Sequence, residues 1–256
     1  MPAMMDMPML NPTLALSSLH NLAKLAHLSL LSTLDIVPGQ GEHDNALDDS
    51  WSPRLATPER APAAPWTRQD ATVLPAHFND SQTYLFTSWA KDNSGDTGCM
   101  NLDCEGFRLV SGSPIFPGDI IQPVSDIKGV RQNITIKVFK DKSSGNWWLH
   151  CGLNSDPIPV GYFPASLFSS LSVKASAIWV GGHVLSDPRV SSPPMGSGAF
   201  ASDTRKAALI RDIQLIDRDG KTTLVSNKMP TTVTDDKLYS VSRIEGGKFY
   251  YGGPAA

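Results

Sequence analysis

The hydrophobic pattern of the chain changes near residue 70. Beyond that point short apolar–polar alternations recur, and the clearest, "VRQNITIKVFK" (130–140), is typical of a β-strand with one buried face. This buried face is predicted to carry Val130, Ile134, Ile136 and Val138. The turn "DKSSG" leads into "NWWLHCGL" (146–153), so these two segments are predicted to form a hairpin.

Other segments repeat this pattern of strand and turn. Asp219-Gly220 separates "ALIRDIQLID" from "KTTLV" and supplies the positive φ of a tight primed turn, which predicts a second hairpin. "TYLFTSW" (83–89), "LYSVS" and "KFYYG" also have the composition of strands, whereas "PASLFSSL", which starts at Pro164, predicts one short helix. Many short strands with almost no helical period predict an all-β fold, either a sandwich or a closed barrel.

The first 70 residues have a different composition. They contain two aromatic residues, both tryptophan, whereas the following 186 residues contain the other 18. Apolar residues recur every three or four positions over 14–34, which predicts an amphipathic leader helix, and a Pro- and Asp-rich linker follows that we expect to be disordered. The sequence therefore predicts a leader and linker over 1–70 and a folded β domain over 71–256.

Charge and composition exclude several classes of function. The net charge of −3 does not provide the positive charge that nucleic-acid binding requires, and no run of about 20 apolar residues is available to span a membrane. The leader is an atypical secretory signal, because its start carries Asp6 and no basic residue. Neither a phosphate-binding glycine loop nor a metal-ligand spacing occurs, so no cofactor and no metal are expected.

The three cysteines and two sequons bear on the compartment. A disulfide between Cys99 and Cys104 is sterically feasible in an oxidising compartment, which leaves Cys151 to be interpreted as a small buried apolar residue. Asn79 and Asn133 each begin an Asn-X-Ser/Thr triplet and are candidate glycosylation sites.

Two further features are candidates for chemistry. His183 interrupts the strand-like run "IWVGGHVLSD" (178–187). An ionisable ring in such a strand either has only a structural role, with its nitrogens hydrogen-bonded, or takes part in a reaction. Trp147-Trp148 offers a sugar-stacking platform, although adjacent strand residues point to opposite faces and only one ring is then free.

Several motifs, in this order, resemble the C-terminal peptidase domain of the neprosin family. They are "LFTSWAKD", "TGCMNLDCEGF", "GNWWL", "VGYFP", "IWVGGHV", "PPMGSGAF" and "FYYGGP". Members of this family are typically secreted plant proteins, and the founding member is a glutamic endopeptidase that cleaves after proline. The resemblance implies an antiparallel β-sandwich over about residues 71–256, a Cys99–Cys104 disulfide, and two glutamates that face each other across a groove.

The chain departs from the family pattern at both glutamate positions. The glutamate of the family's "GGEV" motif falls on His183, and counting back from "LFTSW" places the other near Arg68 in "APWTRQDA". Leu238 occupies the place of a late cysteine. The general acid and general base of the family reaction are therefore expected to be missing.

Three interpretations follow from the resemblance. The first is a neprosin-like peptidase domain that is catalytically impaired, or that retains residual hydrolysis by His183 with an unidentified aspartate. The second is a non-catalytic module that binds Pro-rich peptide or cell-wall carbohydrate in the same groove. This second interpretation requires the groove to be lined by Trp147 or Trp148, Tyr162 and Trp179. The third is an unstable chain that has lost the edge strand before residue 71.

Overall fold

A computed structural model describes residues 13–18, 29–36, 65–91, 97–126, 129–175, 178–184 and 192–253. Strands dominate it, and they are β1 Thr13–Ser18, β2 Ser29–Ile36, β3 Trp66–Thr72, β4 Tyr84–Ala90, β5 Cys99–Met100, β6 Arg108–Leu109, β7 Gln132–Lys140, β8 Trp147–Leu153, β9 Ile158–Phe163, β10 Trp179–Val184, β11 Ala208–Ile216, β12 Thr222–Leu224, β13 Thr231–Val233, β14 Ser240–Val241 and β15 Phe249–Gly252. The helical elements are α1 Pro75–Phe78 and two 3-10 helices, η2 Ala165–Leu167 and η3 Ser170–Ser172.

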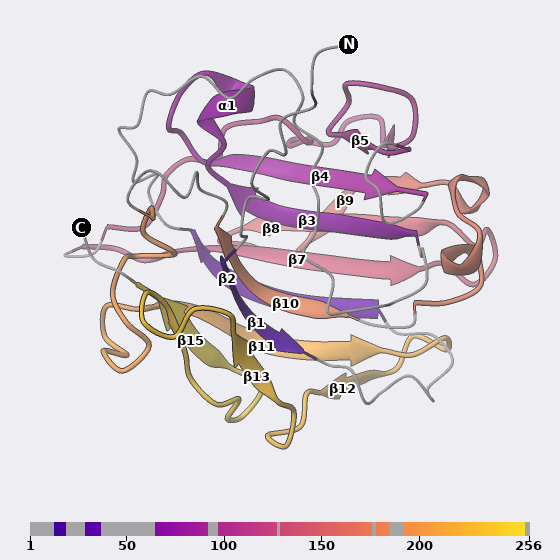
Figure 1. Ribbon diagram of the computed structural model, residues 1–256. Coiled ribbons are helices and arrows are strands. Elements are labelled where there is room, and N and C mark those ends of the chain that lie inside the picture. Colours follow the sequence, from indigo (N-terminus) through magenta and orange to yellow (C-terminus); the bar gives the residue numbers. More distant parts are fainter. Residues whose placement is uncertain are drawn as a thin grey trace, which may run out of the picture.

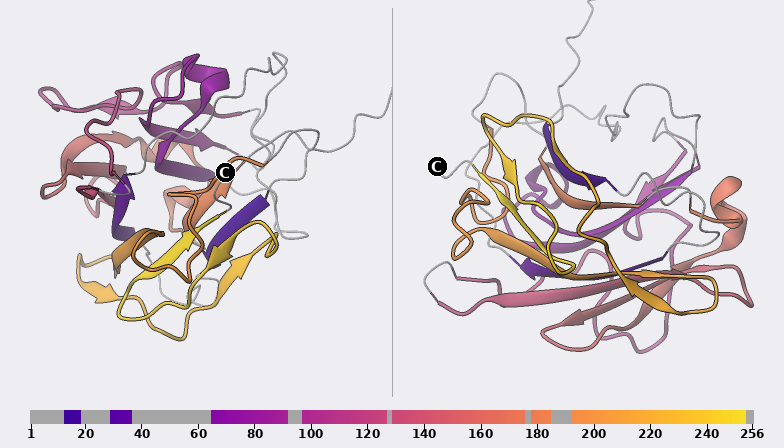
Figure 2. Two further views of the ribbon diagram at one scale, coloured as in Figure 1. Left: turned by 90° about the vertical axis from the view of Figure 1, so that its left-hand side faces the viewer. Right: turned by 90° about the horizontal axis from the view of Figure 1, so that it is seen from below.

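The strands form one large and two small antiparallel sheets. The large sheet has the order β14-β15-β11-β2-β7-β8-β9-β6, with β12 paired to β11, and the small sheets have the orders β3-β4-β5 and β10-β1-β13. In Figures 1 and 2, β3 and β4 lie over β7, β8 and β9 as a second layer. This arrangement confirms the all-β, sandwich-like fold predicted from the sequence.

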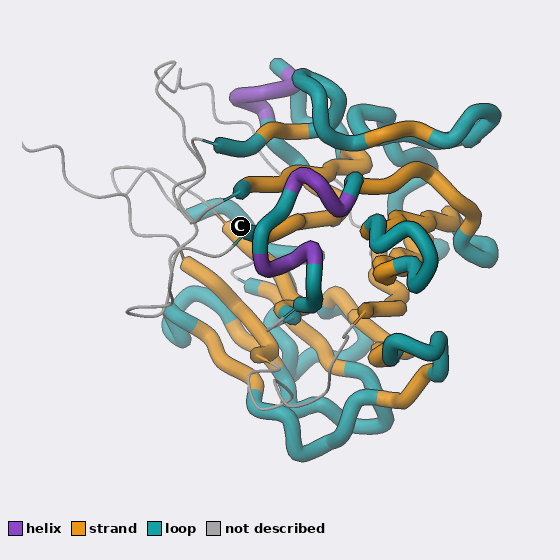
Figure 3. The backbone as a smooth tube through the Cα atoms, turned by 90° about the vertical axis from the view of Figure 1, so that its right-hand side faces the viewer, coloured by secondary structure: helices purple, strands orange, loops and turns teal. Residues whose placement is uncertain are grey.

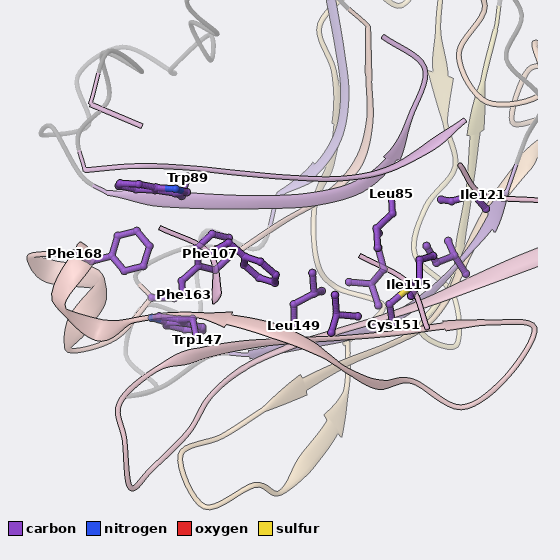
Figure 4. Packing of buried hydrophobic residues seen from close by; sticks show 14 residues of the cluster. Leu85, Trp89, Phe107, Ile115, Ile121, Trp147, Leu149, Cys151, Phe163 and Phe168 are labelled. Atoms are coloured by element: carbon purple, nitrogen blue, oxygen red, sulfur yellow. The ribbon is translucent and has the colours of Figure 1, made fainter. Parts of the chain in front are cut away.

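Two hydrophobic clusters join the layers. The first contains Leu85 and Trp89 of β4 and Ile134 and Leu149 of the large sheet. Figure 4 shows Leu85, Trp89 and Leu149 pointing into the space between the strands. The second joins β10 to β11 and β15. Each small sheet therefore packs its apolar face against the large sheet, as a sandwich requires.

Both predicted hairpins are present. Strand β7 pairs with the whole of β8 from Ile134 to Lys140, and β11 pairs with β12 through a turn in which Gly220 has a φ of 82°. Ile134 and Ile136 are buried as predicted. Val130 is 71% exposed because β7 begins only at Gln132, so its placement on the buried face was wrong.

The helix predicted over 14–34 is wrong for the parts that the structure describes. Residues 13–18 form β1, which pairs with β10 and β13, and residues 29–36 form β2, which lies between β11 and β7. A strand inside a sheet gains hydrogen bonds on both edges, and these tertiary contacts override a helical period in the sequence. The remainder of the predicted leader and most of the linker lie outside the described residues.

The predicted short helix is instead two 3-10 turns. Pro164 precedes η2 as its N-cap, and Phe168, between η2 and η3, packs edge-to-face on Trp89 with ring centroids 6.1 Å apart. The indole N–H of Trp147 donates to the carbonyl of Leu171, 2.9 Å away. Phe168 belongs to the first core cluster and Leu167 and Leu171 pack against it, so these turns border that cluster. Figure 3 shows the two turns in purple, next to each other.

Candidate functional site

Strand β3 places Arg68 and Asp70 on one face. In its antiparallel pairing with β4, Arg68 lies opposite Ser88 and Asp70 lies opposite Phe86. Residues two apart on a strand share a face, and the Arg68 guanidinium carbon accordingly lies 5.6 Å from the centre of the Phe86 ring. The proposed loss of an edge strand before residue 71 is therefore wrong, because β3 is present and fully paired on this side.

Strand β10 carries His183 on the face opposite its core residues. Val180 and Val184 are buried in the second core cluster, so His183 and Trp179 lie on the other face of the strand. Gly182 lets the core approach β10 closely. A Cβ atom there would lie 2.5 Å from Sδ of Met195 and 2.7 Å from a ring carbon of Tyr251. Three of the motifs quoted above thus meet at one glycine and fix the strand that carries His183.

The tertiary structure brings His183 and Arg68 into contact. Nη1 of Arg68 lies 3.3 Å from Nδ1 of His183, and Nε of Arg68 lies 2.5 Å from Oδ2 of Asp70 in an ion pair. The order of contacts is therefore His183–Arg68–Asp70. The residue that stands opposite His183 is a permanent cation, flanked by a carboxylate.

This contact determines which nitrogen of His183 carries the proton. A guanidinium has only hydrogen-bond donors, so Nδ1 of His183 must accept, and the proton of the neutral ring lies on Nε2. Burial, and after it the positive charge of Arg68, lowers the pKa of His183 from 6.5 to about 4. The ring is therefore neutral above about pH 4 and presents an N–H group at Nε2.

Two buried polar atoms of the cluster have no hydrogen-bond partner among the described residues. They are Nε2 of His183, a donor in this tautomer, and Oδ1 of Asp70, an acceptor. A buried donor or acceptor without a partner costs about 1–3 kcal/mol. The cluster therefore holds one donor and one acceptor that are covered from solvent, and a polar ligand reaches them only when the side chains above them move apart.

The cluster is poorly suited to acid–base hydrolysis. Nδ1 of His183 is occupied by Arg68, and Nε2 carries the proton, so neither nitrogen is free to take one from water. A guanidinium does not act as the general acid that protonates a leaving nitrogen. Asp70 is the aspartate that the sequence left unidentified, and it reaches His183 only through Arg68. The spacing Arg-X-Asp within a strand was the signal that could have revealed it.

The four tryptophan and tyrosine candidates do not share one groove, so that prediction is wrong. Trp147 is 3% exposed in the first core cluster, whereas Trp148 and Tyr162 lie on the outer face of the large sheet, with ring centroids 4.9 Å apart. Trp179 is 41% exposed and shares the face of His183. Of the four, Trp179 alone lies on the strand face that carries His183, four residues away along β10.

The cysteine predictions are confirmed. Cys99 and Cys104 form a disulfide, and Cys151 is a free thiol, 1% exposed, whose pKa burial raises to about 12. Asn79 is exposed after α1, and Asn133 is partly buried near the start of β7; glycosylation at both stays a prediction.

The fold and the cluster define an antiparallel β-sandwich protein with a polar site where its two small sheets meet. A family model described as Neprosin matches residues 70–254. This match covers most of the chain, and the chain belongs to the neprosin family. The match begins two residues after Arg68, at Asp70. Among the described residues no helix is long and apolar enough to cross a membrane.

Proposed function

We propose that this neprosin-family protein binds an extended peptide at the His183–Arg68 face and does not cleave it efficiently. The observation that carries the proposal is the 3.3 Å contact between Arg68 and His183, the two positions where the family resemblance places glutamates. A general acid and a general base contribute about 10²–10⁴-fold each, and here neither is supplied. The family reaction is therefore impaired at its proton transfers rather than in its scaffold.

A peptide is the ligand class that best fits the cluster. A peptide group carries one acceptor and one donor, which match the N–H at Nε2 of His183 and the free oxygen of Asp70. Trp179 offers an exposed ring on the same face, against which a flat, apolar proline side chain can pack. Carbohydrate at this cluster is less favoured, because Trp147, Trp148 and Tyr162 lie elsewhere.

We also propose that the protein is secreted. The Cys99–Cys104 disulfide supports an oxidising compartment, where such bonds form and persist. The neprosin family match is compatible with that location.

The test combines cleavage and binding by the purified protein. A fluorescent peptide with internal prolines is incubated at acid pH and analysed by mass spectrometry, and its binding is measured by fluorescence polarisation. We expect binding that weakens several-fold in Trp179→Ala, and no cleavage above that of His183→Ala, the matched control. Efficient cleavage after proline by the unmodified protein would remove the claim of impairment.

Variants with engineered carboxylates test why cleavage is impaired. Arg68→Glu and His183→Glu are made singly and together, so that only the double variant has two carboxyl groups at the contact. We expect the single variants to stay inactive and the double variant alone to gain proline-directed cleavage. Activity in His183→Glu by itself would show that Arg68 is not the obstacle.

A further inference from the structure

A row of aromatic and basic side chains crosses the outer face of the large sheet, away from the His183–Arg68 cluster. In strand register, Phe139 of β7 lies opposite Trp148 of β8, Trp148 lies opposite Tyr162 of β9, and Tyr162 lies opposite Arg108 of β6. Directly paired residues of antiparallel strands point to the same face, so these four side chains form one line across four strands. Neighbouring strands are about 4.8 Å apart, so the line is about 14 Å long.

The sandwich core does not account for this row. The inner faces of the same strands bury Trp147, Leu149 and Phe163 in the first core cluster, and that cluster is complete without the outer rings. The outer face of an antiparallel sheet that faces water is ordinarily polar. Here Trp148, Tyr162 and Phe139 are partly exposed, and Trp148 and Tyr162 lie against each other with an angle of 36° between their rings.

The charge of this face is positive. Next to the aromatic row, Lys137 lies opposite His150, and Nζ of Lys137 lies 4.9 Å from the centre of the Phe139 ring. Strands β6, β7, β8 and β9 contain no aspartate or glutamate. Although the whole chain has a net charge of −3, this face therefore attracts anions.

We propose that the row Phe139–Trp148–Tyr162–Arg108, with Lys137 and His150 beside it, is a docking surface for an acidic polysaccharide. The faces of aromatic rings carry negative charge density and attract the polarised C–H groups of a pyranose ring. Arg108 and Lys137 then pair with the carboxylates of uronic acid residues. The line of rings across the strands matches a linear ligand better than a compact one.

The chemistry favours a polysaccharide over single-stranded nucleic acid. Nucleic acid binding relies on many basic side chains that follow the phosphate backbone, whereas this surface has two permanent cations, Arg108 and Lys137. The Cys99–Cys104 disulfide also supports an oxidising compartment.

The test is affinity electrophoresis of the full chain through gels that contain polygalacturonate, with dissociation constants measured by calorimetry. A methyl-esterified polymer with the same backbone and an oligothymidylate serve as matched ligands. The variants are Trp148→Ala and Tyr162→Ala for the rings and Arg108→Gln for the charge. Phe116→Ala, which removes an exposed ring from the loop beside β4, is the control variant.

We expect binding to polygalacturonate that weakens at least tenfold in Trp148→Ala, three- to tenfold in Arg108→Gln and not at all in Phe116→Ala. Rising salt and esterification should each weaken it further. No retardation, equal binding of the esterified polymer, or tighter binding of the oligothymidylate would overturn the proposal. Should Trp148→Ala lose its cooperative thermal transition, Tyr162→Ala and Arg108→Gln decide the outcome, and unchanged binding in both would overturn it.

Discussion

The neutral imidazole of His183 should make the stability of this protein depend on pH. Its pKa is about 4 in the folded protein, against an ordinary value of 6.5, because burial and then the charge of Arg68 oppose the protonated ring. Between these two values the unfolded chain binds a proton that the folded protein does not. The free energy of unfolding therefore falls as pH falls from about 6.5 to about 4, and the stabilisation is fully present above the upper value.

The size of this effect follows from the two pKa values. The interval from 6.5 to about 4 corresponds to about 3 kcal/mol in total, of which about 2 kcal/mol is lost by about pH 5. Urea denaturation at pH 7.5 and at pH 5 measures it. We expect the wild type to lose about 2 kcal/mol more than His183→Gln, which keeps a polar side chain but does not titrate.

Two further measurements isolate the cause. NMR titration of the His183 ring proton, assigned by its absence in His183→Gln, should show no change near pH 6.5 and a midpoint near 4. Arg68→Gln should raise that midpoint, whereas Arg108→Gln, a matched substitution on the outer face of the large sheet, should not. If the wild type and His183→Gln lose equal stability between pH 7.5 and pH 5, the assignment of a buried, neutral His183 beside Arg68 is refuted.

Three other predictions concern the scaffold. Gly182→Ala should lower the free energy of unfolding by about 1–3 kcal/mol in urea denaturation, because the new methyl group overlaps Met195; an unchanged midpoint would mean that β10 shifts freely. Cys99→Ser should be about 2 kcal/mol less stable than the wild type under oxidising conditions and equally stable once the wild-type disulfide is reduced, as thermal melts with and without a reductant would reveal. Cys151, whose pKa burial raises to about 12, should react with a thiol reagent only on unfolding, and rapid labelling of the native protein would contradict its burial.

Local features of the fold were predictable from the sequence. The alternation in 130–140, the Asp219-Gly220 turn and the strand "TYLFTSW" gave β7, the β11–β12 turn and β4, because strand period and turn chemistry are local properties. The family resemblance also predicted that Arg68 and His183 stand at the two glutamate positions, although it could not show that the two side chains touch. The prediction of a leader helix was wrong because β1 and β2 are formed by pairing with strands distant in the sequence, which is not a local property.

The sequence by itself determined the all-β class and the hairpins, and the family resemblance predicted that both glutamates are replaced. Only the tertiary structure decided that Arg68 donates to His183, that Asp70 joins them, and that Trp148 and Trp179 lie on different surfaces. A strand's period of two shows which residues share a face. It does not say which sheet covers that face or which distant strand supplies the neighbour, and both the proton on His183 and the ligands proposed here depend on those contacts.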